Sequence, residues 1–228
     1  MTHSDTTRFD RLVAGAAMVL APLVIVLAEV LHAQAETDAA ALLSRVAADP
    51  GRWLGSHLLV LTALVLVVPA YVGVVRLVRP KRPRVGSLGL VLFAPGLVAL
   101  TALVGMEVVV WQMAQPEAAR EEMVALVERL NESVALMLLY AAALLFPLAW
   151  LLIGIGLYLA RTAPVWAAVL MASAQPVGFV AELSGAPKWI AVAAQAAFAI
   201  GLTPIGLRVL RSSDRDAEEP LRTRPAPA

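Results

Sequence analysis

Six long apolar runs constrain the fold of this chain more than any other feature of its sequence. A helix needs about 20 apolar residues to cross a hydrocarbon core about 30 Å thick. Because lipid offers no partner for a backbone amide, each run has to satisfy its own hydrogen bonds, as a helix does. We therefore expect an all-α membrane bundle, with the spans arranged as three hairpins. The predicted spans are residues 12–31, 53–78, 85–113, 134–159, 164–183 and 189–210.

The composition supports the membrane class and excludes several chemistries. Of the 228 residues, 60% are hydrophobic and 15% are charged, whereas soluble domains have roughly 45–50% apolar and about 25% charged residues. The chain has no cysteine, which excludes disulfides, thiolate catalysis and cysteine-ligated metals. A net charge of +1 gives no indication of nucleic-acid binding. Phosphate loops and nucleophile elbows are not found in the sequence.

The basic residues predict the orientation of the spans. Cytoplasmic ends of membrane helices carry an excess of Lys and Arg, and thirteen of the 18 basic residues fall on one set of ends. Both termini are therefore expected in the cytoplasm, with tails at 1–11 and 211–228, the second of them disordered. A composition rich in Ala, Val, Leu and Arg indicates a high-GC bacterium, and hence its cytoplasmic (inner) membrane. The thirteen residues are Arg8, Arg11, Arg76, Arg79, Lys81, Arg82, Arg84, Arg161, Arg208, Arg211, Arg215, Arg222 and Arg224.

Two of the connections on the outer side are long enough to hold helices of their own. In residues 37–48, Leu42, Leu43 and Val46 share one helical face. Residues 116–130 combine an apolar face with an acidic one, which is the pattern of a surface helix. We expect two short amphipathic helices on the outer face.

The spacing of acids and prolines suggests an internal repeat. Glu29 precedes Pro69 by 40 residues, and Glu107 precedes Pro147 by the same number. A third acid and proline recur at a shorter spacing in the last two spans. This pattern predicts three hairpins of common design, although chance matching in so biased a composition is an equal alternative.

The acids within the spans all lie in the outer part of their helices. They are Glu29, Glu107 and Glu182, and His32 and His57 lie at the same depth. A charged group costs roughly 2.5–3.5 kcal/mol at the centre of a membrane helix on insertion scales, and less near its ends. This one-sided gathering is the main functional indication in the sequence.

Four of these residues form a candidate metal site. Glu29 and His32 lie three residues apart on one helix face, as ligands do in metal-binding bundles, while His57 and Glu107 approach from neighbouring spans. A set of imidazoles and carboxylates without thiolate suits Zn, Mn or Fe. A metal-bound water could then attack an ester or an amide. A haem between the two histidines is less favoured, because both lie near helix ends.

Other residues are candidates for ligand binding. Glu182 is one, and Trp111 and Gln112 follow Glu107 on the same span. Gln175 and Gln195 lie inside spans five and six, where an amide needs a hydrogen bond between helices. We expect them either to line a polar path inward from the outer acids or to hold the helices together. Two structural readings stay open for the acids and histidines, a hydrogen-bonded cluster and separate interfacial residues that reach water.

Three classes of function follow from this pattern. The first is a membrane protein with a metal or small-ligand site in the outer leaflet, including a metal-dependent hydrolase of lipids or amides. The second is a small transporter or cation carrier that uses the same acids. The third is a structural or partner-binding subunit without catalysis. The sequence leaves open whether the protein is an enzyme, and which residues would be catalytic.

Three stretches resemble a family of small six-helix integral membrane proteins of high-GC bacteria, which carries a domain-of-unknown-function label. They are Pro22 with residues 28–32, residues 49–53 leading to His57, and residues 129–133. The resemblance covers about residues 9–211 and implies membrane residence without a known activity. Membrane hydrolases of the ceramidase type also bind zinc through histidines and acids. This chain has no His-x-x-x-His in its final span, so no catalytic residue is transferred from them.

Overall fold

The computed structural model describes residues 3–33, 36, 38–116 and 118–212. These residues form nine helices and contain no strand. Six of the helices, counting α6 and α7 as one span, are long and apolar enough to cross a membrane, which is consistent with a multi-pass membrane protein. The helices are α1 (His3–Leu31), α2 (Ala39–Ala48), α3 (Pro50–Val78), α4 (Pro83–Met113), α5 (Arg120–Asn131), α6 (Val134–Ala143), α7 (Leu145–Ala160), α8 (Val165–Leu183) and α9 (Lys188–Arg211).

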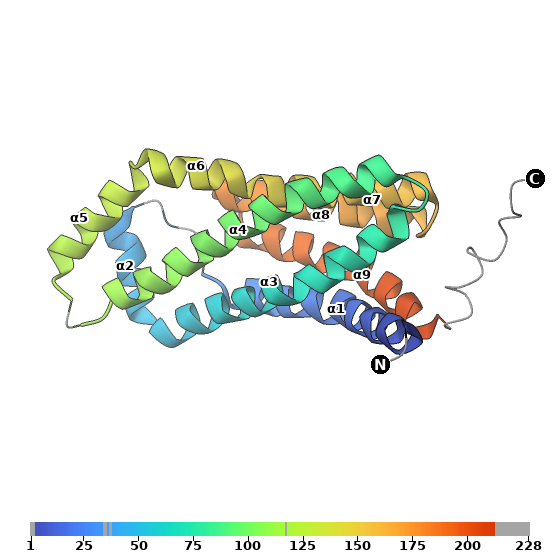
Figure 1. The fold of residues 1–228 in the computed structure, drawn as a ribbon. Helices are drawn as coiled ribbons and strands as arrows, with labels where there is room; N and C mark the ends of the chain where they lie inside the picture. Colours follow the sequence, from blue (N-terminus) through green and yellow to red (C-terminus); the bar gives the residue numbers. More distant parts are fainter. Residues whose placement is uncertain (1–2, 34–35, 37, 117, 213–228) are drawn as a thin grey trace, which may run out of the picture.

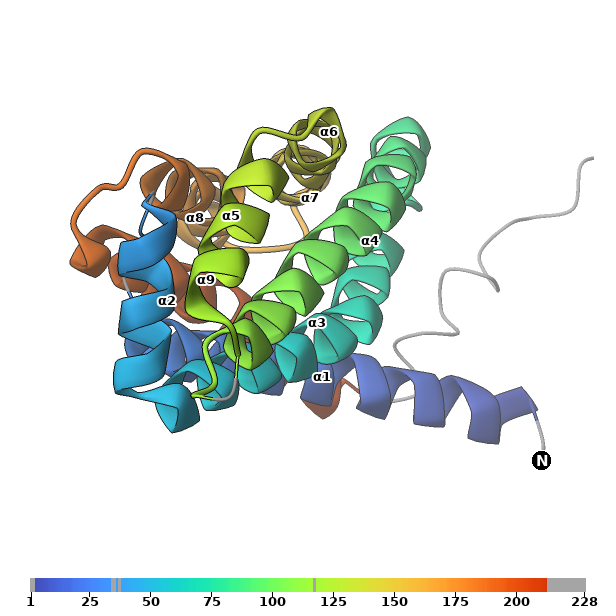
Figure 2. The ribbon, with the colours of Figure 1, turned by 90° about the vertical axis from the view of Figure 1, so that its left-hand side faces the viewer.

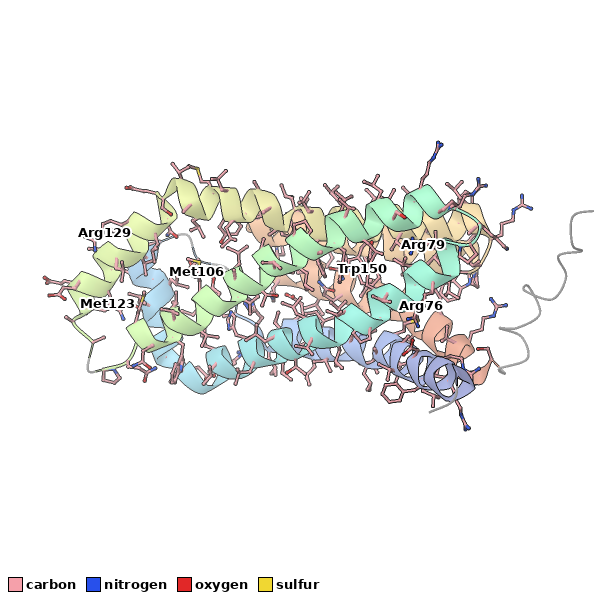
Figure 3. All side chains as sticks on the ribbon, viewed as in Figure 1. Arg76, Arg79, Met106, Met123, Arg129 and Trp150 are labelled. Carbon is pink, nitrogen blue, oxygen red and sulfur yellow. The ribbon has the colours of Figure 1, made fainter. Side chains whose placement is uncertain are left out.

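The long helices form one elongated bundle (Figure 1). The helix α1 packs against α3 and α9, α4 packs against α3 and α7, and α8 packs against α7 and α9. The start of α1 and the end of α9 lie at one end of the bundle, which we call the terminal end; α2 and α5 lie at the other, which we call the cap end. Arg76 and Arg79 lie at the terminal end and Arg129 at the cap end (Figure 3). The side of the membrane that each end faces stays a prediction, as do the hairpin arrangement and the internal repeat.

The helix bounds differ most from the predicted ones at two places. The predicted span 134–159 is interrupted at Leu144, between α6 and α7. Pro147 has no N–H to donate to the carbonyl of Ala143, and this missing hydrogen bond accounts for the break. The first helix begins at His3, so the tail expected at 1–11 is largely helical. The disorder expected after residue 212 lies outside the described residues.

The two short helices form a cap over one end of the bundle (Figure 2). The side chain of Asp38 accepts a hydrogen bond from Ala41 N at 2.7 Å and begins α2. Asp49 ends α2 and begins α3 by accepting from Arg52 N at 3.0 Å. Because α2 and α5 pack on each other, Leu43 of α2 is fully buried. The apolar faces of these helices are therefore covered partly by protein. The sequence pattern alone predicts that they lie against the membrane surface.

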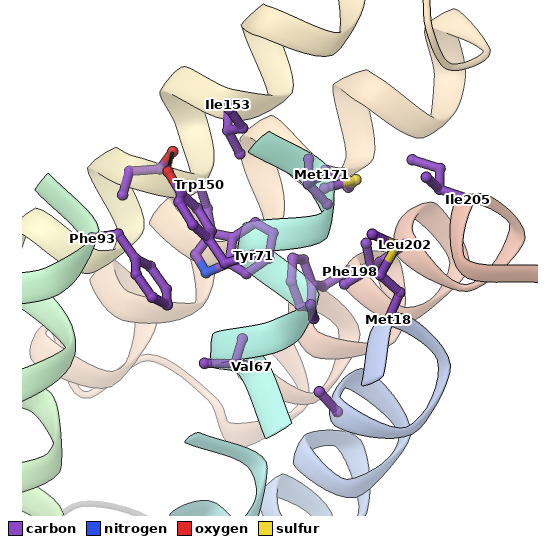
Figure 4. Close-up of a cluster of buried hydrophobic side chains, with 14 of the residues drawn as sticks. Met18, Val67, Tyr71, Phe93, Trp150, Ile153, Met171, Phe198, Leu202 and Ile205 are labelled. Carbon is purple, nitrogen blue, oxygen red and sulfur yellow. Dashed lines mark hydrogen bonds between the residues drawn. The ribbon is translucent and has the colours of Figure 1, made fainter. Parts of the chain in front are cut away.

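A cluster of aromatic side chains fills the middle of the bundle (Figure 4). Tyr71 and Phe93 stack with ring centroids 3.9 Å apart, and Trp150 meets Phe198 edge-on at 4.7 Å. The Tyr71 hydroxyl donates to the carbonyl of Ala149 at 3.1 Å, so the only polar atom of the Tyr71 side chain is satisfied. On α3 this cluster lies nearly four turns closer to the terminal end than His57 does.

Candidate functional site

A cavity of about 250 Å³ lies between the aromatic cluster and the cap end. All six spans contribute to its walls, and most of the lining is apolar. The structure therefore brings together side chains that are far apart in the sequence. The predicted site residues that line the cavity are Glu29, His32, His57, Glu107, Gln175, Glu182 and Gln195.

Lys188, at the start of α9, is the central cation of this site. Its ammonium group donates hydrogen bonds to Glu29 and, at 3.1 Å, to Glu182. The side chains of Glu29, Lys188 and Glu182 are 12%, 22% and 35% exposed, respectively. Two carboxylates therefore share one ammonium group, mostly away from solvent.

Lys188 is not among the site residues predicted from the sequence. The signal that could have found it is its depth. Lys188 follows Glu182 by six residues, across a turn in which Gly185 adopts a φ of +63°. A lysine at the start of one span and a glutamate at the end of the preceding one have to lie at the same membrane level.

A hydrogen-bonded chain connects Lys188 with the two histidines. The carbonyl of Trp53 lies 2.7 Å from His57 Nδ1, and because a carbonyl can only accept, that nitrogen carries the proton. In a neutral ring, His57 Nε2 then accepts from His32 Nε2, which lies 3.2 Å away. His32 Nδ1 is left to accept from the Lys188 ammonium at 3.4 Å. The three hydrogen bonds therefore all point the same way, from the Lys188 ammonium through His32 and His57 to the Trp53 carbonyl.

The protonation of His32 agrees with this assignment. Burial lowers the pKa of His32 to about 4, and the nearby charge of Lys188 acts in the same direction. The ring is therefore neutral at pH 7, as the hydrogen-bonded chain requires.

Trp53 holds the histidine on α3 and joins α3 to α4. Its carbonyl also accepts a hydrogen bond from the Ser56 hydroxyl at 2.9 Å. The Trp53 indole N–H donates to the backbone carbonyl of Glu107 at 2.9 Å, and the Trp53 and His57 rings lie 4.6 Å apart. His57 is only 1% exposed. Packing and hydrogen bonds therefore fix the position of this imidazole.

Glu107 differs from the other two acids because its carboxyl group has a buried oxygen without a partner. Within the described part of the chain, Glu107 Oε2 makes no hydrogen bond. Gln175 and Gln195, by contrast, satisfy each other through a 3.0 Å hydrogen bond between α8 and α9. Trp111 packs with the residues of the cap and Gln112 is exposed, so neither of these two candidates lines the cavity.

The geometry also bears on the predicted metal centre. Of the residues that the structure describes, no three His, Asp or Glu side chains are grouped so that they could hold a metal ion. All four ring nitrogens of His32 and His57 take part in the hydrogen-bonded chain. A metal or haem iron at this place would have to separate the rings, and would meet the ammonium of Lys188. The metal centre therefore stays a prediction.

A second cavity, of about 320 Å³, lies on the cap side of His32 and Lys188. It is lined by residues from the ends of α1, α2, α3 and α9, including Arg45, Arg52 and Lys188. His32 lines both cavities. The polar cluster of His32 and Lys188 therefore forms a partition between them.

Comparisons with protein-family models, with curated proteins and with solved structures found no match to this chain. The fold and the site alone define its class. It is an all-helical bundle with six apolar helices long enough to span a membrane, and it has a cavity between these helices with polar side chains at its cap end.

Proposed function

We propose that this protein is a multi-pass protein of the bacterial inner membrane that binds an amphipathic small molecule in the 250 Å³ cavity. The apolar body of the ligand would lie against the hydrophobic walls, and its polar end would meet the carboxyl groups at the cap end. With both termini in the cytoplasm, this site belongs to the outer leaflet. The observation that carries the proposal is an apolar cavity ending at a buried carboxyl oxygen without a partner.

Two physical arguments support binding over a purely structural role. An unfilled cavity costs a bundle packing energy, by about 24 cal/mol for each Å³ in one well-studied series. Buried ionisable groups in a membrane domain are also costly, and they mark binding or transport sites. An apolar pocket with a few convergent polar groups is the usual form of a small-molecule site.

The test is a binding measurement on the protein in lipid nanodiscs, with empty nanodiscs as the blank. Phenylalkyl compounds of one size, with neutral, positive and negative end groups, are titrated by calorimetry. We expect at least one to bind saturably with a stoichiometry of one. Leu103→Trp, on the cavity wall, should weaken that binding at least tenfold. The matched control on the same helix is Val98→Trp, at a position 70% exposed on the bundle surface, and it should bind as the wild type does. Absence of binding by every compound would overturn the proposal.

A carrier is the second candidate, and the pair of Gln175 and Gln195 favours it. This pair extends the polar lining of the cavity away from the carboxyl groups. The aromatic cluster closes the cavity toward the terminal end, so transport would require Trp150 and Phe198 to move. Uptake of a bound phenylalkyl compound into proteoliposomes at a rate above that of empty liposomes would support the carrier, and an equal rate would refute it.

A further inference from the structure

We propose that the ligand of the cavity is an organic cation, a lipophilic amine or quaternary ammonium whose charge lies beside Glu107. This inference rests on the proposed binding function and names the chemical class of the ligand. It is carried by the charges that line the cavity and by the hydrogen bonds that already engage them.

The cavity lining is acidic and carries no cation of its own. Three carboxyl groups, those of Glu29, Glu107 and Glu182, line it, and the lining side chains that the structure describes include no Lys or Arg. Lys188 lines the second cavity and not this one, and its ammonium is already shared by Glu29 and Glu182. The remaining carboxyl group, that of Glu107, therefore has no cation to pair with among the residues that the structure describes.

The histidines cannot supply the missing charge. His57 Nδ1–H is directed to the Trp53 carbonyl, and the Nε2–H of His32 is directed to His57. Both rings are neutral in this chain, and neither has an N–H left for Glu107. A positively charged ligand would provide what the protein itself does not.

The apolar walls suit the same class of ligand. Tyr140, Phe146, Trp150 and Phe198 line the cavity, and aromatic faces attract ammonium groups through their quadrupoles. A neutral ligand could offer a hydrogen bond to the Glu107 carboxyl group, but no charge to pair with its carboxylate form. An anionic ligand would meet three carboxyl groups in a medium that screens them poorly. Charge and shape together therefore favour a cation with an apolar body.

The test compares two ligands of nearly identical shape, benzyltrimethylammonium and its neutral carbon analogue neopentylbenzene. Both are titrated by calorimetry into nanodisc-embedded protein at pH 7.4. We expect the wild type to bind the cation at least about tenfold more tightly, which is about 1.4 kcal/mol. In Glu107→Gln the two ligands should bind with affinities within about twofold of each other, because only the charge has been removed.

Two further variants keep the experiment decisive. Glu107→Asp retains the charge and should keep the preference for the cation, which separates loss of charge from loss of folding. Glu128→Gln makes the same chemical change at an exposed position of α5, and it should leave both affinities unchanged.

The outcomes distinguish this inference from the proposed function. Equal binding of both ligands by the wild type would overturn the cation inference and leave the binding function standing. A preference for the cation that survives in Glu107→Gln would overturn the role of Glu107. No saturable binding of either ligand, or of any other compound in the set, would overturn the proposed function and this inference together.

Discussion

Replacing Lys188 by Met tests whether the ion pairs at the cap end stabilise the bundle. The substitution keeps most of the side-chain volume and removes the only cation that contacts Glu29 and Glu182 in the described structure. Breaking a buried ion pair by removing one partner costs about 3–5 kcal/mol, because it leaves a buried charge without compensation. Lys188 keeps 22% of its side chain exposed, so we expect the lower end of this range, about 3 kcal/mol. That is a large part of a typical folding free energy of about 5–15 kcal/mol.

The assay is equilibrium unfolding of the purified protein in mixed micelles with increasing sodium dodecyl sulfate. The matched control is Lys81→Met at the terminal end, where, among the described residues, the ammonium donates to the carbonyl of Ala160 alone. We expect that control to cost about 1 kcal/mol. The double variant Lys188→Met/Glu29→Gln should recover part of the loss, since it removes the most buried of the uncompensated charges.

Two results would refute this reasoning. If Lys188→Met were no less stable than Lys81→Met, the ion pairs would contribute nothing beyond an ordinary surface contact. If adding Glu29→Gln made Lys188→Met less stable still, the loss would come from packing around the lysine stem and not from an unpaired carboxylate.

Three other predictions concern packing, pH and topology. A Cβ at Gly96 would collide with the backbone of α7, whereas one at Gly105 would meet nothing within 4 Å. Gly96→Ala should therefore destabilise the bundle by about 2 kcal/mol, and Gly105→Ala should leave its stability unchanged. The same unfolding assay measures both. Because the pKa of His32 is lowered from 6.5 to about 4, the unfolded chain binds more protons between these values and stability should fall as pH drops through that range; His32→Gln should have a melting temperature that depends less on pH, and an unchanged dependence would contradict the assignment. Since the chain has no cysteine, a membrane-impermeant maleimide applied to intact bacteria should label Ser44→Cys at the cap end and not Ser212→Cys at the terminal end, and the reverse pattern would invert the proposed orientation.

Much of the fold could be predicted from local sequence patterns. A membrane helix satisfies its own backbone, so its existence depends on the apolar length of one segment and not on its neighbours. For this reason the apolar runs correspond to the six candidate spans within a few residues. Short-range signals were equally readable, since Asp49 followed by Pro50 marks the end of α2 and the start of α3. The break at Leu144 was missed, because prolines such as Pro69 are tolerated inside continuous helices of the same bundle.

The candidate site could be predicted only in part. The depth of Glu29, His32, His57 and Glu107 follows from their position along each span, and the structure places all four on one cavity. The position of a residue along its span does not, however, predict which way its side chain faces around the helix axis. Gln112, five residues beyond Glu107, is turned by about 140° around the helix axis from it and is exposed.

Sequence alone determined that this chain is a set of apolar helices whose acids and histidines lie at one level, because span length and depth are properties of single segments. Only the tertiary structure decided which of those groups neutralise one another. It pairs Lys188 with Glu29 and Glu182 and joins His32 to His57. In the described part of the chain, a carboxyl oxygen of Glu107 has no partner and lies beside an apolar cavity. Pairing depends on how helices are rotated and packed against each other, and that is set by contacts between residues as far apart in the chain as Glu29 and Lys188.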